Sequence, residues 1–262
     1  MARLMGIINC TPDSFSDGGA LPTTASAIAH GENLIAQGAA ILDIGGESTR
    51  PGSAPVTLEE EWARIGPVVA ALAPRFTVSV DTTKAEIARR AMSAGAAIIN
   101  DVSAATADAA MLETVARGKA ILIVMHSRGS QTTMLRDYAP YGDVVSEVRQ
   151  YLIARVAAAR AAGVREIWID PGLGFGKSAE DNWALTRALA TLNGVGDGLV
   201  YAASRKRFLK ALALETGSHI ELDELTSCLT TVAMLAGATV VRVHSVVASR
   251  AALAIAERIH LS

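Results

Sequence analysis

Polar residues that can bind ligands or exchange protons follow the short apolar runs of this chain. They are Asn9, Asp43, Asp81, Asn100, His126, Asp170, Ser204 with Lys206, and Arg242 with His244. If each run is a buried parallel strand, its carboxyl end opens into a loop, and in a closed barrel these ends converge on one face. Carboxylates, amides, imidazoles and cations would then share one site.

The last pair has the spacing of an anion-binding site. Arg242 and His244 are two positions apart, so on a strand both side chains point to the same side. A guanidinium group presents a fork of N–H donors that suits phosphate oxygens. The alternative is a salt bridge between Arg242 and a carboxylate at the end of a neighbouring strand.

A lone carboxylate, Asp170, follows the apolar run 167–169. A buried carboxylate without a partner is costly, which favours a ligand edge rich in N–H groups. The segment after it ends in Gly-Lys-Ser, as a phosphate-binding P-loop does. That motif requires glycine at position 171, where this chain has Pro171 with no N–H to offer. We therefore reject the P-loop.

Two neighbouring runs end on groups that can recognise a heterocycle. Asp81 accepts hydrogen bonds and Asn100 both donates and accepts them. Together they match a ring whose edge carries both hydrogen-bond donors and acceptors. The alternative for Asp81, and the favoured role for Asp101, is to cap the helix that follows. His126 either joins the site or is hydrogen-bonded at the rim, while His30, His219 and His260 are expected at the surface.

The first two strands are followed by long polar loops. Residues 9–19 form a longer loop than a plain turn needs, which indicates function, with a surface loop as the alternative. In residues 43–52, Arg50 stands between Gly-Gly and Pro-Gly. This pattern is equally consistent with a loop that binds a ligand through Arg50 and with an Arg50 that is simply exposed to solvent. Asn9 supplies an amide oxygen, a ligand type that Mg²⁺ accepts beside substrate phosphates.

The elements that must position these groups alternate between strands and helices. Apolar runs at 76–80, 96–99, 120–125, 167–169 and 239–241 are separated by Ala-rich helical stretches, which predicts an α/β fold with a parallel sheet. Thr57 with Glu60 and Thr83 with Glu86 have capping-box spacing, and Gly95, Gly163 and Gly237 stand where helices should end. We predict one domain, residues 1–262, forming a single (β/α)8 TIM barrel with its active site at the C-terminal ends of the strands.

Composition excludes several other classes. Hydrophobic residues make up 50% and charged residues 19%, with a net charge of -2, so we expect a globular enzyme that binds neither nucleic acid nor membranes. Cys10 and Cys228 are too few for a disulfide framework, and residues 1–8 are too short for a signal peptide. The expected location is the cytoplasm.

Taken together, the motifs resemble those of the dihydropteroate synthases. In family order, the chain contains MGIIN, TPDSFSDGG, DIGGESTRPG, SVDTTK, GAAIINDVSA, MHSRG, DPGLGFGK, SRK and RVH. The resemblance covers essentially the whole chain. It implies joining of 6-hydroxymethyl-7,8-dihydropterin pyrophosphate to 4-aminobenzoate with release of pyrophosphate, Mg²⁺ as cofactor, and a homodimer.

The resemblance also implies a role for each matching residue. The pterin would be bound by Asp81, Asn100, Met125, Asp170 and Lys206. Pyrophosphate would be bound by Asn9, Thr49, Arg242 and His244, with Asn9 as the Mg²⁺ ligand. Thr49, Arg50, Pro51, Phe175 and Ser204 would border the aminobenzoate. The catalytic group would be Asn9, Lys206, Arg242 and His244.

The expected chemistry needs no protein nucleophile and no general base. Loss of pyrophosphate from an activated CH2 is promoted by groups that stabilise negative charge on the leaving group. Electron donation by the ring would favour a cation-like carbon, which the neutral aryl amine then attacks.

Three positions depart from the family pattern. Ser245 follows RVH where the family usually has Asp, Lys210 replaces a Gly after SRK, and Thr226 replaces a Gly before the final unit. The departures permit a noncatalytic pterin-binding subunit. A corrinoid methyltransferase on the same barrel, with similar pterin contacts, is the other alternative. The Arg242 and His244 pair favours the synthase.

Overall fold

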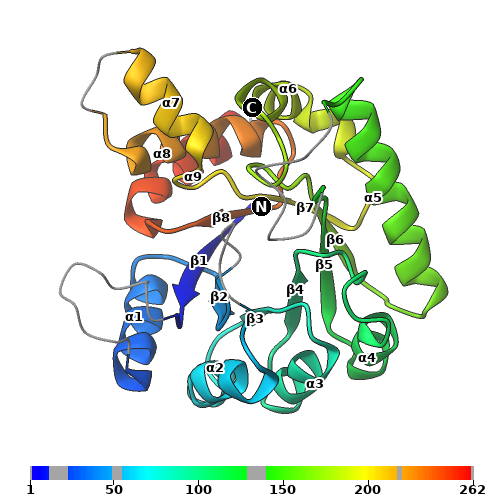
Figure 1. Cartoon of the computed structure of the whole chain (residues 1–262). Helices are drawn as coiled ribbons and strands as arrows, with labels where there is room; N and C mark the ends of the chain where they lie inside the picture. Colours follow the sequence, from blue (N-terminus) through cyan, green and yellow to red (C-terminus); the bar gives the residue numbers. More distant parts are fainter. Residues whose placement is uncertain (1, 12–22, 49–54, 129–139, 217–219, 261–262) are drawn as a thin grey trace.

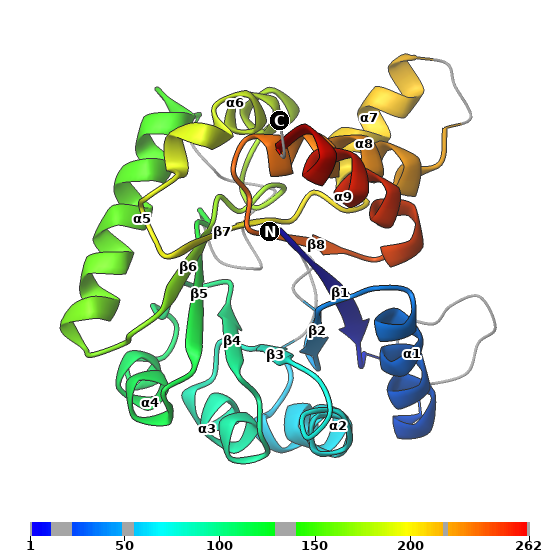
Figure 2. The same ribbon diagram turned by 180° about the vertical axis from the view of Figure 1, so that it is seen from behind.

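Eight parallel strands close into a barrel, which a ring of helices surrounds (Figures 1 and 2). The computed structural model describes residues 2–11, 23–48, 55–128, 140–216 and 220–260. The strands are β1 (Arg3–Asn9), β2 (Ile41–Gly45), β3 (Val78–Asp81), β4 (Ile98–Asp101), β5 (Ile121–Met125), β6 (Ile167–Asp170), β7 (Gly198–Tyr201) and β8 (Val240–Val243). The predicted (β/α)8 TIM barrel is confirmed.

The helices alternate with these strands, and two of them separate β7 from β8. They are α1 (Thr24–Ala36), α2 (Leu58–Leu72), α3 (Ala85–Ser93), α4 (Met111–Gly118), α5 (Val144–Ala161), α6 (Ala179–Arg187), α7 (Arg207–Glu215), α8 (Leu222–Leu235) and α9 (Val246–His260), with a 3-10 helix η1 (Leu189–Leu192). None of the helices in the described ranges is long and apolar enough to cross a membrane. Cys10 and Cys228 are both unpaired thiols.

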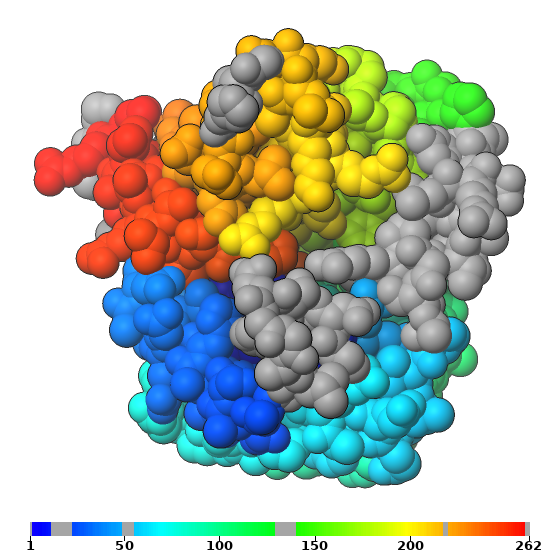
Figure 3. Space-filling model, turned by 60° about the vertical axis from the view of Figure 1, so that its left-hand side comes forward, coloured from blue at the N-terminus to red at the C-terminus, as the bar shows by residue number. Residues whose placement is uncertain are grey.

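The barrel closes where the last strand pairs with the first. Met5 of β1 lies opposite Ile41 of β2 on one side and opposite Arg242 of β8 on the other. On the surface, the orange and red helices of the last unit lie next to the blue first helix (Figure 3). This closure brings residues more than 200 positions apart in the chain into one ring.

A layer of apolar side chains fills the barrel interior. It consists of Met5, Ile41, Ile98, Ile123, Trp168, Val200 and Val240, and is separate from the larger core between strands and helices. Because side chains on a strand repeat every two residues, the next inward layer is two positions further along. That layer contains Asp43, Asn100, Met125, Asp170 and Arg242. The apolar layer is therefore the floor on which the polar site stands.

Helix starts and ends agree with the sequence in most of the predicted places. Thr57 and Glu60 form the predicted capping box of α2, and Gly95, Gly163 and Gly237 follow helices with φ of +102°, +92° and +100°. The prediction for Thr83 and Glu86 is wrong. Lys84 is the N-cap of α3 without a side-chain cap, and the backbone N–H of Ala85 donates to Asp108 instead (2.9 Å).

Candidate active site

Arg242 lies at the centre of the polar layer and pairs with two carboxylates. Its Nε donates to Asp43 Oδ2 (2.6 Å) and its Nη2 to Asp81 Oδ2 (3.2 Å). Asn100 Nδ2 also donates to Asp43 Oδ2 (3.3 Å). The salt-bridge alternative for Arg242 thus describes this structure, although Nη1 makes no hydrogen bond to any described residue and is available to an anion.

The two carboxylates share one guanidinium group at short range. Burial raises the pKa of Asp81 to about 7, the negative charge of Asp43 adds to the rise, and Arg242 opposes it. Asp43 is fully buried, and its Oδ1 has no hydrogen-bond partner among the described residues. This corner of the site therefore combines a carboxyl group that titrates near neutrality with an unsatisfied acceptor.

Asp170 ends β6 with one oxygen bound by the chain. Its Oδ1 accepts from the backbone N–H of Gly172 (2.7 Å), while its other oxygen has no partner within the described part of the chain. Gly172 has φ +68°, and a Cβ there would lie 1.8 Å from the backbone oxygen of His126. Burial raises the pKa of Asp170, against the opposing charges of Lys206 and Arg242. The remaining oxygen is placed to accept from a ligand.

Lys206 adds a positive charge beside this carboxylate. Its Nζ lies 4.3 Å from the ring centroid of Phe175, a cation–π contact. Burial lowers the pKa of Lys206 to about 8, and Arg242 contributes to the decrease. Burial makes the charged form of Lys206 less stable, so an electron-rich ligand bound beside it would stabilise the ammonium group.

His244 follows β8 and its ring is bound on one side. The hydroxyl of Ser204 lies 2.9 Å from His244 Nδ1 and accepts from the His244 backbone N–H (3.1 Å). Burial lowers the pKa of His244 to about 3, with Arg242 the next cause. The imidazole is therefore neutral over the physiological range.

The side chain of Lys177, the lysine of the rejected P-loop motif, is buried in the protein. Its Nζ lies 2.9 Å from His126 Nδ1 and donates to the backbone oxygens of Gly172 (2.8 Å), Phe175 (3.1 Å) and His126 (3.3 Å). Burial lowers the pKa of Lys177 to about 7, and burial and Lys177 lower that of His126 to about 3. His126 is thus a satisfied group at the rim, and Lys177 holds the loop that carries Phe175.

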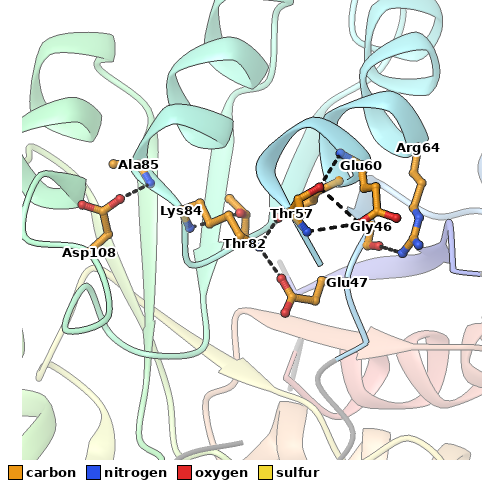
Figure 4. Close-up of polar contacts among 10 residues, drawn as sticks. Gly46, Glu47, Thr57, Glu60, Arg64, Thr82, Lys84, Ala85 and Asp108 are labelled. Carbon is orange, nitrogen blue, oxygen red and sulfur yellow. Dashed lines mark hydrogen bonds and ion pairs between the residues drawn. The ribbon is translucent and has the colours of Figure 1, made fainter. Parts of the chain in front are cut away.

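A partly buried ion-pair cluster supports the loop after β2. Lys84 Nζ is bonded to Glu47 and, at 2.6 Å, to the fully buried Glu61 of α2. Figure 4 shows the Lys84 and Glu47 pair beside Arg64, whose Nη1 donates to the backbone oxygen of Gly46 (2.8 Å). Both contacts fasten the start of the loop to neighbouring helices.

Sequence reasoning missed Lys84 and Glu61, and a signal existed for Glu61. It occupies the first position of the buried stripe that continues with Ile65, Val68 and Leu72 of α2. A charged residue on an apolar helix face normally requires a buried partner. The sequence predicted Asp43 at a strand end but assigned it no role. In the structure it lies in the inward layer, where it accepts hydrogen bonds from Asn100 and Arg242.

The remaining predicted residues fall into two groups. Asn9 ends β1 with a carboxamide that makes no hydrogen bond to the described chain, and Met125 is buried opposite Asp170. Thr49, Arg50 and Pro51 lie outside the described residues, as do His219 and the side chain of His260. His30 is half-buried, and burial lowers its pKa, so its expected surface position is only partly right. Asp101 has a structural role, since it accepts from Ser103 and Ala105 in the turn after β4. It does not cap the following helix as predicted, because the N-cap of α4 is Ala110, without a side-chain hydrogen bond.

Comparisons with known proteins identify the family of this chain. Residues 5–244 match the family described as pterin binding enzyme. The chain is 44% identical over 258 residues to the dihydropteroate synthase of Mycobacterium leprae, covering 96% of this chain and 91% of that protein. The solved Yersinia pestis dihydropteroate synthase, in a sulfonamide drug complex, superposes with a TM-score of 0.91 at 34% identity, covering 100% and 95% of the two chains.

A second solved structure is similar over the same extent. The Xanthomonas albilineans dihydropteroate synthase with 4-aminobenzoic acid has a TM-score of 0.89 at 40% identity and covers 100% of this chain and 94% of its own. These relatives are synthases, which favours that activity over corrinoid methyl transfer. The chain therefore belongs to the pterin binding enzyme family, within its dihydropteroate synthase branch.

Proposed function

We propose that this chain joins 6-hydroxymethyl-7,8-dihydropterin pyrophosphate to 4-aminobenzoate by way of a cation-like pterin carbon. One observation carries the mechanism: the open oxygen of Asp170 lies in the same inward layer as Arg242, with Lys206 and His244 on the adjoining strand ends. A site with an acceptor on one side and cations on the other suits a ring with N–H groups joined to an anion.

The pterin ring is assigned to the floor of this site. Asp170 accepts from the ring's amino and N–H groups, and Asn100 donates and accepts beside it. Asp81 and Lys206 complete the polar contacts, and Met125 supplies an apolar surface. Asn100 and Arg242 hold Asp43 in place, so this carboxylate orients the residues that touch the ring rather than the ring itself.

The leaving pyrophosphate is assigned to Arg242, His244 and Asn9. Arg242 keeps Nη1 for the anion while its other nitrogens bind carboxylates, which fixes the direction of the guanidinium plane. These groups stabilise charge that grows on the leaving oxygen, so they act on the transition state more than on the bound substrate.

Mg²⁺ fits the donor that Asn9 offers. Its amide oxygen is a hard ligand with no competing hydrogen bond to the described chain, and Mg²⁺ commonly takes few protein ligands when phosphate oxygens complete its shell. When bound, the ion supplies charge neutralisation to the leaving group.

The aminobenzoate is assigned to the space bordered by Phe175 and Ser204, together with Thr49, Arg50 and Pro51. The solved Xanthomonas albilineans relative contains 4-aminobenzoic acid. The ring of Phe175 lies under Lys206, so the aryl amine would enter next to the pterin carbon. No protein base is required, because the neutral amine is already nucleophilic.

We further propose that the chain acts in the cytoplasm as a homodimer. The support for the dimer is that α8 and α9 carry several exposed apolar side chains, which include Val232, Leu235, Val247 and Ile255.

A pyrophosphate-release assay with both substrates and Mg²⁺ tests the function. We expect release to require 4-aminobenzoate and dihydropteroate to form in equal amount. The Arg242→Met variant should lose most of the activity, while Arg89→Met, on the outside of α3, should retain it. Pyrophosphate release that is independent of aminobenzoate would contradict the synthase, and no release with a bound pterin would indicate a noncatalytic protein.

A further inference from the structure

Ser204 and His244 form a closed pair at the ends of β7 and β8. Ser204 is 5% exposed, and its hydroxyl oxygen contacts two nitrogens of His244, the backbone N–H at 3.1 Å and Nδ1 of the ring at 2.9 Å. No other hydrogen bond of this hydroxyl occurs in the described chain. Among the described residues, His244 is therefore the only possible acceptor for the hydrogen of this hydroxyl.

The backbone contact decides the direction of the ring contact. The His244 N–H can only donate, so it occupies one lone pair of the Ser204 oxygen. If Nδ1 also carried a proton, both nitrogens would donate to this oxygen and the buried hydroxyl hydrogen would have no acceptor. Leaving a buried donor unsatisfied costs about 1–3 kcal/mol. If Nδ1 is unprotonated, the hydroxyl donates to it and every group is satisfied.

We infer that Ser204 is a positioning residue that holds His244 in the tautomer with its proton on Nε2. Nε2 is the other ring nitrogen, separated from Nδ1 by Cε1 and directed away from Ser204, and it has no hydrogen-bond partner among the described residues. His244 therefore presents one N–H donor of fixed direction. That this donor meets pyrophosphate rests on the proposed function, whereas the tautomer does not.

The charges around the ring oppose a second proton. Arg242, Arg205 and Lys206 all disfavour the imidazolium form, and burial is the largest cause of the low pKa. The carboxylate that acts on the ring, Asp223, is bound through both oxygens by Arg205 (2.8 and 2.7 Å). Its charge is therefore largely compensated, and it does not replace a carboxylate partner.

This pair accounts for the departure at position 245. A carboxylate after RVH would be a candidate partner for the imidazole. Here the Ser245 hydroxyl instead accepts from the backbone N–H of Ala248 (3.3 Å) at the start of α9. Ser204, from the turn that follows β7, is the group that contacts the ring.

Two-dimensional ¹⁵N NMR of the imidazole nitrogens tests the tautomer in the ligand-free protein. The His244 signals are assigned by their loss in His244→Gln. At neutral pH we expect Nδ1 at the position of an unprotonated ring nitrogen and Nε2 at that of a protonated one. A protonated Nδ1, or a mixture of tautomers in the unmodified protein, overturns the inference without any further variant.

Three variants separate positioning from general structure. Ser204→Ala should release the tautomer, giving a mixture of the two forms, and should weaken binding of pyrophosphate with Mg²⁺ roughly fivefold, the value of one hydrogen bond. Ser204→Thr keeps the hydroxyl and should restore both. Ser245→Ala is the matched control, since it removes a neighbouring hydroxyl that does not contact the ring, and should change neither.

The outcomes distinguish this inference from the proposed function. An unchanged tautomer in a folded Ser204→Ala protein overturns the positioning role. If the tautomer behaves as expected but pyrophosphate does not bind the unmodified protein, the proposed function fails and the tautomer assignment stands.

Discussion

Asp43, Asp81 and Asp170 belong to one ring of strand ends, and Arg242 makes direct ion pairs with the first two. Asp170 has only a backbone donor from the described chain, although Lys206 and Arg242 act on it electrostatically. Because buried carboxylates lose hydration, each must gain from a cation, a donor or a proton. Asp81 responds with a pKa near 7, whereas the open oxygen of Asp170 is the one that a ligand can satisfy.

Asp170→Asn tests the role of the open oxygen. The amide can still accept from Gly172 through its oxygen, so the fold should be preserved, but its NH2 would face the N–H edge of the pterin. We expect affinity for a pterin analogue to fall about 100-fold, since a hydrogen bond to a charged group contributes up to about 3 kcal/mol. Isothermal titration calorimetry measures this change.

Asp101→Asn is the control with the opposite expectation. Asp101 accepts from Ser103 and Ala105 outside the site, so its variant should lower the melting temperature and leave pterin affinity unchanged. If Asp170→Asn is folded and binds the analogue as tightly as the unmodified protein, Asp170 does not contact the pterin.

The raised pKa of Asp81 predicts a dependence of stability on pH. Its native value of about 7 lies above the ordinary 3.8, so between these values the native state binds more protons than the unfolded chain. The free energy of unfolding contributed by this group is therefore fully present below about pH 4 and decreases as the pH rises towards about 7. Asp81→Asn should remove this part of the decrease.

Urea unfolding at several pH values between about pH 4 and about pH 7 measures the difference between the two proteins. A constant difference across the range would mean that Asp81 is ionised throughout. That result would mean that the charge of Arg242 outweighs burial in the titration of Asp81.

At the scale of elements, the strands place the chemistry by their two-residue repeat. Ile41, Ile98, Trp168 and Val240 point into the apolar floor, so Asp43, Asn100, Asp170 and Arg242 point into the site. The loops need separate support, because they are not held by the barrel's hydrogen bonds. The cluster of Lys84, Glu47 and Glu61 supplies such support after β2.

Lys84→Met tests this cluster. It leaves two carboxylates close together without their cation, one of them fully buried, and we expect a loss of about 3–5 kcal/mol in the free energy of unfolding. At a temperature at which this variant is folded, the KM for 4-aminobenzoate should rise more than the KM for the pterin substrate. The reason is that Glu47 directly precedes the segment with Thr49, Arg50 and Pro51, which is assigned to the aminobenzoate. Denaturant unfolding and steady-state kinetics measure the two effects.

Arg89→Met is the matched control, because the pair of Arg89 with Glu86 is exposed. Exposed pairs contribute about 0–1 kcal/mol, so this variant should be nearly unchanged. The double variant Glu61→Gln with Lys84→Met should recover part of the lost stability, since it also removes the buried charge. Equal stability of Lys84→Met and Arg89→Met would contradict the supporting role.

At the scale of the whole molecule, the barrel was predictable because its signals are local. Apolar runs of strand length, the capping box at Thr57 and the glycines at 95, 163 and 237 each depend on a few neighbouring residues. The strand-end rule then predicts that Asp170, Asn100 and Arg242 face one site.

The contacts that the sequence left undecided are long-range. Whether Arg242 binds an anion or a carboxylate depends on Asp43, 199 positions earlier, and only barrel closure brings them together. Lys84 and Glu61 come from different units, and Ser204 meets His244 40 positions later. Thr83 does not cap α3, because Asp108, which follows the next strand, accepts the hydrogen bond from the backbone N–H of Ala85.

The surface suggests how two molecules would associate. Val232 and Leu235 of α8 and Val247 and Ile255 of α9 are exposed on two helices that pack against each other (orange and red in Figures 1 and 2). A stable interface buries about 800 Å² on each partner, and adjacent apolar helix faces suit a two-fold contact of this size. For the proposed homodimer, we expect light scattering after size-exclusion chromatography to give twice the 27.2 kDa of one chain.

Val232→Glu combined with Ile255→Glu should shift the protein to the mass of one chain, because a dimer would place like charges in an apolar contact. Leu214→Glu on α7, where Leu214 is the most exposed of the large apolar side chains described, is the control and should remain dimeric. The assigned site residues lie at strand ends and in the loops that follow them, and not on the exposed faces of α8 and α9, so the monomeric variant should keep aminobenzoate-dependent pyrophosphate release. An unchanged mass in the double variant would place the contact elsewhere, and loss of activity in a folded monomer would mean that the partner chain completes the site.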